Sequence, residues 1–186
     1  INVRVGGFHR APRKRELAPL AETLKRAYDQ ALDTLRWVAT FDFPDRSRDY
    51  TFVTLKHPDE YPFSEGRIVS NRGLSIDAAD WEAHFGEQHI PYTNALQARM
   101  TDGSAYLVGP LARYSMNFHQ LSPAVQQAAR EAGLGETCLN PYQSIVVRSV
   151  ETLHAVEEAL RVIANYEEPD APFVPVVPGP GTGMAA

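Results

Sequence analysis

The sequence predicts an α+β fold, with a pair of long antiparallel helices, a small antiparallel β region and short helices. Apolar residues recur every three or four positions near both ends of the chain, which is the spacing of one face of a helix. In the middle the period changes to two, as in a strand. We expect residues 1–170 to form a single domain and residues 171–186 to form an extended tail rich in proline and glycine.

The first long helix is expected over residues 16–39. Pro19 fits the first turn of this helix, where a missing N–H does least harm. Pro44 lies shortly after the expected end and prevents the helix from continuing. The apolar residues of this helix form a stripe along one face, and a stripe of this length needs an apolar partner. The stripe consists of Leu17, Leu20, Ala21, Leu24, Ala27, Tyr28, Ala31, Leu32, Leu35 and Val38.

The second long helix provides that partner and is expected from Asn140 to about Tyr166. Asn140 is a suitable N-cap, and Pro141 is a suitable first helical residue. The two helices should bury each other's stripes across a long intervening segment. The second stripe consists of Tyr142, Ile145, Val146, Val150, Leu153, Val156, Leu160 and Ile163.

The segment between the helices is expected to hold the β region. Residues 50–55 alternate and are rich in β-formers, residues 67–70 are a candidate partner strand, and residues 71–73 form a turn. A short helix should start near Asp77, include Phe85 and stop at Gly86.

Further along, the dipeptide at 102–103 predicts a hairpin between residues 95–99 and 106–108. A second short helix is expected over residues 124–132. Residues 172–178 should be extended across the domain, and we expect disorder from Gly179 onward.

The composition predicts a folded protein with one sizeable core or two small ones, because 44% of the 186 residues are hydrophobic and 22% are charged. The sequence contains no apolar run long enough for a membrane span, so we expect no membrane partner, signal peptide or anchor. The net charge of -5 and scattered arginines argue against nucleic acid. One basic cluster is interpreted as an interface, with a phosphate-binding arm as the alternative; it comprises Arg4, Arg10, Arg13, Lys14 and Arg15.

Cys138 is the only cysteine. It therefore excludes a disulfide framework, a four-cysteine zinc site and an iron-sulfur cluster held by this chain alone, and it favours a reducing, cytoplasmic location. Because Cys138 lies just ahead of a helix, its thiol could have a lowered pKa; a packing role is the plainer interpretation.

The remaining candidates do not form a catalytic pattern. His84 and His89 are interrupted by Gly86 and do not have the spacing of two ligands on one side of a helix, and His9, His57 and His119 have no ligand-spaced neighbour. His154 falls on the second stripe and is expected to be a hydrogen-bonded core residue. Gly6 and Gly7 favour a turn or close packing over a phosphate loop. Residue chemistry alone therefore assigns no catalytic, cofactor-binding or metal-binding residue.

Several short segments stand out along the chain. They are VRVGGF at 3–8, RAP at 10–12, RWV at 36–38, YLVGPLAR at 106–113, LSP at 121–123, NPYQSIVVRSVE at 140–151 and EEAL at 157–160. In this order and spacing they resemble the middle of a nickel-iron hydrogenase large subunit. The resemblance is closest to the soluble, cytoplasmic, cofactor-coupled group.

The resemblance implies a parent enzyme that splits or forms dihydrogen reversibly at a nickel-iron centre with carbon monoxide and cyanide ligands. In that family two cysteine pairs hold the metals, in Arg-x-Cys-Gly-x-Cys and Asp-Pro-Cys-x-x-Cys signatures, and neither is present here. One cysteine cannot replace four soft thiolates. We therefore expect an internal fragment, inactive alone, with the first signature upstream of Ile1 and the second downstream of Ala186.

The resemblance also implies partners. These are an iron-sulfur small subunit and the remainder of the large subunit. Apolar surfaces that contact these partners in the parent should be exposed in the fragment and should promote its self-association. One alternative is a non-catalytic electron-transfer-complex subunit that kept a hydrogenase-like shape. Another is a stand-alone α+β module that binds a small molecule.

Overall fold

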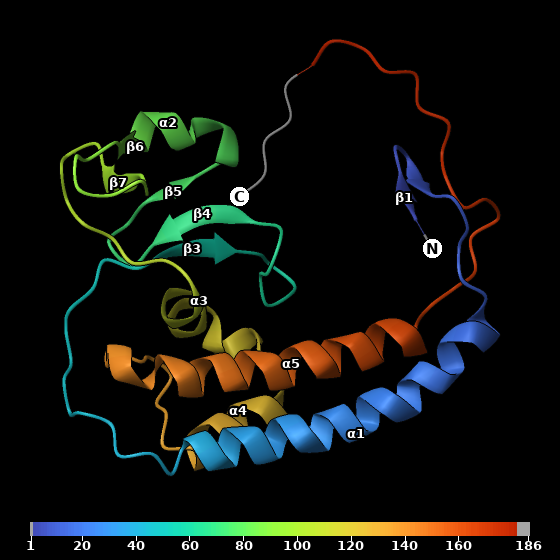
Figure 1. Cartoon of the computed structure of the whole chain (residues 1–186), viewed down its shortest axis with the longest axis horizontal. Coiled ribbons are helices and arrows are strands. Elements are labelled where there is room, and N and C mark those ends of the chain that lie inside the picture. The colour runs from blue at the N-terminus through green and yellow to red at the C-terminus, as the bar shows by residue number, and fades with distance from the viewer. Residues whose placement is uncertain (1, 182–186) are drawn as a thin grey trace.

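The computed structural model describes residues 2–181 and confirms a mixed fold of helices and small antiparallel sheets. In Figure 1, helices α1 (Lys14–Val38), α4 (Pro123–Glu131) and α5 (Ser144–Ala164) form one layer, and α3 (Pro110–Asn117) lies between this layer and the β lobe. Within the described part of the chain, no helix is both long and apolar enough to cross a lipid bilayer.

The two terminal helices begin as their sequences suggest, with small differences in their bounds. The Glu16 carboxylate accepts a hydrogen bond from the Arg13 N–H (2.8 Å) at the start of α1, and Pro19 lies in the second turn, not the first. The Asn140 side chain accepts from the Tyr142 N–H at 3.0 Å, but the helix it caps is the 3₁₀ helix η3 (Pro141–Gln143), which leads into α5.

Helices α1 and α5 lie side by side and run in opposite directions (Figure 1). Their shared face is buried at only one end. On α1 the buried residues are Ala31, Leu35 and Val38, whereas Leu20 is 49% exposed. On α5 the buried residues lie between Val146 and His154, and Val162 is 55% exposed. The N-terminal half of α1 and the C-terminal half of α5 therefore present apolar side chains to solvent.

The main core is formed where α3 and α4 cover the buried end of α1 and α5. Its most enclosed large side chains include Tyr114, Phe118 and Leu153. Helix α4 starts as predicted, with the Ser122 hydroxyl accepting from the Val125 N–H (3.3 Å), and it is followed by Gly133 at φ 81.

The β lobe contains a three-stranded antiparallel sheet in the order β3 (Val53–Lys56), β4 (Arg67–Ser70) and β5 (Ser75–Ile76). The predicted strand at 67–70 and the turn at 71–73 are confirmed, and Gly73 has φ 95. The strand predicted at 50–55 is displaced. A smaller core lies against this sheet and comprises Val53, Ile68, Ile76 and Phe85.

Two predictions in the β lobe are wrong. The hairpin pairs β7 (Gln97–Met100) with β6 (Phe85–Gln88), and not with residues 106–108. Phe85 pairs with Met100, so the short helix α2 (Trp81–His84) ends before Phe85, not at Gly86. Phe85 is buried, and either a helix or a strand at this position would bury it. The spacing of apolar residues therefore could not decide between the two secondary structures.

Residues 106–108 have a different role. Leu107 forms a parallel bridge to Phe52. The chain then continues into α3, a helix that was not predicted from the sequence. Gly109 has φ 87 and Pro110 is the first residue of α3, so the Gly-Pro pair starts this helix.

Residues 6–8, near the N-terminus, pair with residues 172–174, which follow α5. The Phe8 N–H donates to the Pro172 carbonyl and the Val174 N–H donates to the Gly6 carbonyl, each at 2.9 Å, which attaches the tail to the hairpin of β1 (Val3–Arg4) and β2 (Gly7–Phe8). Residues 174–181 form no helix or strand, and in Figure 1 the tail leaves the hairpin and arches away from the helical layer. The expectation of disorder from Gly179 lies largely outside the described residues, which end at 181.

Candidate functional site

The histidines are dispersed over the surface and the core. His84 ends α2 and His89 follows β6, and the two do not share a helix. His9 and His119 are exposed. Among residues 2–181, no three His, Cys, Asp or Glu side chains gather so as to hold a metal ion.

Cys138 lies in the main core. Its side chain is buried, its N–H donates to the Ser115 hydroxyl (3.0 Å), and its Sγ lies 3.5 Å from the Asn140 carbonyl oxygen. Burial raises the pKa of the Cys138 thiol. The position just ahead of η3 therefore does not activate the thiol, and the packing interpretation holds.

The two glycines near the N-terminus allow close packing. Gly6 and Gly7 have φ values of 86 and 146, and a Cβ on Gly6 would lie 2.1 Å from the Val174 carbonyl oxygen. A side chain at this position would separate the tail from the hairpin. The interpretation as a turn or packing element is confirmed, and these glycines face another backbone.

His154 is a core residue, as its place on the stripe predicts, and it is 6% exposed. Its ring lies 5.0 Å from the ring of Tyr61 and 5.7 Å from that of Phe63. The expected hydrogen bond is absent at Nδ1, which has no partner within residues 2–181. Burial lowers the pKa of His154, and the nearby carboxylates of Glu157 and Glu158 oppose this only in part.

A buried cluster that the sequence analysis did not identify joins three distant segments. Arg113 of α3 donates to Glu151 of α5 through Nε to Oε1 (2.6 Å) and through Nη2 to Oε2 (2.9 Å). The Tyr61 hydroxyl, from the loop after β3, donates to the same Oε1 at 2.7 Å. The Glu151 side chain is 8% exposed and that of Arg113 is 23% exposed.

The electrostatics of this cluster favour a fixed charge pair. Burial, and then the Glu151 carboxylate, raise the pKa of Tyr61, so the phenol stays protonated and remains a donor. Burial acts to lower the pKa of Arg113, but the bonds to Glu151 outweigh it and raise the pKa overall. No local pattern marked the cluster, because Glu151 lies beside the apolar stripe predicted for α5 and not on it, in line with the buried Val147. A buried carboxylate requires a partner, but its burial is visible only in the folded chain.

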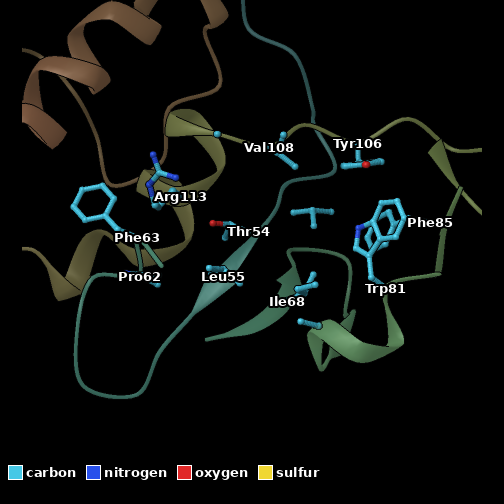
Figure 2. Close-up of a pocket in the computed structure, with 13 residues that line it drawn as sticks. Thr54, Leu55, Pro62, Phe63, Ile68, Trp81, Phe85, Tyr106, Val108 and Arg113 are labelled. Atoms are coloured by element: carbon cyan, nitrogen blue, oxygen red, sulfur yellow. The ribbon is translucent and has the colours of Figure 1, made fainter. Parts of the chain in front are cut away.

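A pocket of about 360 Å³ opens between the β lobe and α3. Figure 2 shows its two ends: Trp81, Phe85 and Tyr106 gather at one, and Phe63 and Arg113 lie at the other. The Trp81 and Phe85 rings stack at 5.6 Å, and Tyr106 meets Phe85 edge-on at 4.9 Å. The Arg113 guanidinium lies 5.2 Å from the centre of the Phe63 ring.

A shallower groove continues from the pocket along α5. It shares Phe63 and Arg113 with the pocket and extends past Arg148 to the small side chains of Ala155 and Ala159. The hydroxyl groups in the described linings of pocket and groove belong to Thr54, Tyr106 and Thr152, and the Thr152 hydroxyl donates to the Arg148 carbonyl at 2.9 Å. The arrangement is suited to non-covalent binding.

Comparison of the chain with models of protein families and with curated proteins finds no match.

Proposed function

We propose that this chain is the scaffold portion of the large subunit of a cytoplasmic nickel-dependent hydrogenase. The full-length parent would oxidise dihydrogen reversibly, and the isolated chain would be inactive. In this proposal α1 and α5 act as the long helix pair that holds cysteine-bearing segments in place, because a loosely held metal shell loses activity.

One observation carries the proposal. The two longest segments that resemble the hydrogenase family, at 106–113 and 140–151, meet in space through their last residues. Arg113 ends the first segment, Glu151 ends the second, and the two form the buried ion pair described above. The proposal requires the two segments to belong to one structural framework, and their contact through a buried ion pair meets that requirement.

The residues of this chain do not fit a nickel-iron centre. Such a centre needs several thiolates, and the chain has a single cysteine. The Cys138 thiol is buried, lies 3.5 Å from the Asn140 carbonyl oxygen and has a raised pKa, so its thiolate is not available. The proposal therefore assigns all metal ligands to flanking parts of the parent and derives no chemical step within this chain.

The uncovered end of α1 and α5 supports a place within a larger assembly. Leu20 and Val162 are exposed there, and Leu24 lines the groove beside α5. In the proposal this surface meets the remainder of the large subunit, while the basic cluster around Arg10 and Arg13 meets that remainder or the iron-sulfur small subunit. In isolation, such apolar surfaces favour self-association.

The proposal is tested on the parent enzyme. The gene should encode a Cys-x-x-Cys pair on each side of this segment, and the purified parent with its small subunit should reduce a viologen dye under dihydrogen. Serine in place of a flanking cysteine should abolish this activity, whereas Cys138→Ser, the matched control, should retain it. A parent without flanking cysteines would overturn the proposal and support a non-catalytic electron-transfer subunit.

A further inference from the structure

The aromatic end of the pocket is built to cover a flat ring. Trp81 and Tyr106 are only half-buried although both belong to the smaller core, so each presents part of its ring to the pocket. At the rim, Phe63 is 41% exposed and Val108 is 57% exposed. A planar apolar ligand would remove these surfaces from water and stack on rings whose orientation is already fixed.

The other end of the pocket carries a positive group held in place. Arg113 is the only charged residue in its lining. Nε and Nη2 of Arg113 are committed to Glu151, and no hydrogen bond from Nη1 is found within residues 2–181. Guanidinium nitrogens only donate, so the N–H groups of Nη1 favour an acceptor oxygen, and a carboxylate makes the strongest such bond. The Glu151 carboxylate occupies the other edge of the guanidinium and neutralises part of its charge.

We propose that this pocket binds a small planar aromatic anion. One or two fused rings would lie against Trp81, Phe85 and Tyr106, and a carboxylate or similar group would point towards Nη1 of Arg113. The volume of about 360 Å³ is at the lower end of the range for small-molecule sites. The proposal does not depend on the hydrogenase assignment, because the pocket is formed entirely by this chain.

The ligand class can be tested with 2-naphthoate and its neutral isostere 2-naphthamide. The chain has two tryptophans, so its nitrogen–proton correlation spectrum contains two indole signals, which Trp37→Phe assigns. We expect 2-naphthoate to shift the Trp81 signal saturably and to leave Trp37, exposed on α1, unchanged. The amide should bind about three- to tenfold more weakly because it loses the charge-assisted bond.

Two variants of neighbouring alanines locate the site. Ala78 lines the pocket, whereas Ala83 is exposed on α2 and does not. Ala78→Phe should fill the pocket and weaken 2-naphthoate binding by at least about tenfold, since the new ring occupies the ligand's place. Ala83→Phe introduces the same side chain and should change the affinity by less than about twofold.

Several results would overturn the proposal: parallel shifts of the Trp37 and Trp81 signals, equal affinities for acid and amide, or equal binding by folded Ala78→Phe and Ala83→Phe. The comparison of acid with amide uses the unaltered protein, so it decides the matter even if Ala78→Phe does not fold.

Discussion

Arg113 and Glu151 form a two-point ion pair that joins α3 to α5, and Tyr61 completes it from the loop after β3. Tyr61 and Glu151 are 90 positions apart, and Arg113 and Glu151 are 38 apart. The pair thus links the β lobe to the helical layer. Because Glu151 is nearly inaccessible, removing either charge leaves the other without an adequate partner.

Glu151→Ala should lower the free energy of unfolding by about 3 kcal/mol, because it strands the Arg113 guanidinium and the Tyr61 hydroxyl. Urea denaturation followed by circular dichroism measures the change. Glu157→Ala on the same helix is the matched control, since Glu157 makes no ion pair within residues 2–181, and it should cost less than about 0.5 kcal/mol. Equal costs for the two variants would show that the cluster contributes nothing.

The sequence predicted the helices and strands that depend on local patterns. The stripe of α1, the strand at 67–70 and the start of α4 at Ser122 each follow from periodicity or capping chemistry within a few residues. The choice between helix and strand at Phe85 depended on its pairing with Met100, which no local pattern specifies.

The candidate site was harder to predict than the fold elements. The pocket combines Trp81 and Phe85 with Arg113, and Arg113 lies on a helix, α3, that was not predicted from the sequence. Glu151 carried no usable signal either, because it lies beside the apolar stripe predicted for α5 and not within it. Its partners could not be named, because pairing over such separations is decided by tertiary packing.

His154 should make stability depend on pH. Its folded-state pKa lies below the ordinary value of about 6.5, so as the pH falls below that value the unfolded chain takes up a proton that the folded chain does not. Stability should therefore be greatest above about pH 7 and decrease towards the lower folded-state pKa. Urea midpoints measured from about pH 5 to 7.5 give this slope.

His154→Phe retains a ring between Tyr61 and Phe63 and should flatten that pH dependence. His89→Phe removes an exposed histidine and should leave the slope unchanged. A slope that survives in His154→Phe would assign the pH dependence to other groups.

Gly6→Ala should release the tail, because the added Cβ would collide with the Val174 carbonyl and Gly6 has φ 86. The amide of Val174, bonded to the Gly6 carbonyl, should exchange at least about tenfold faster with deuterium. Gly179→Ala is the control, since a methyl group on Gly179 would meet no atom within 4 Å, and it should not alter that exchange. Unchanged protection in Gly6→Ala would contradict the close approach of the two backbones.

The Cys138 thiol should react slowly with disulfide reagents in the native chain. Because burial raises its pKa, a disulfide reagent at pH 8 should modify the native chain at less than about one-tenth of the rate found in urea. The single cysteine makes the assay unambiguous. Equal rates in the native and unfolded chains would show that the thiol is accessible and ionised.

The central claim is that this chain frames a nickel-iron centre whose ligands lie elsewhere in the parent. Nickel content per polypeptide, measured by mass spectrometry on the parent purified from its native source and on the 1–186 chain after nickel loading, tests it most directly. We predict one nickel per parent and no stoichiometric nickel on the chain alone. A parent without nickel, or a tightly held nickel ion on the isolated chain, would contradict the claim.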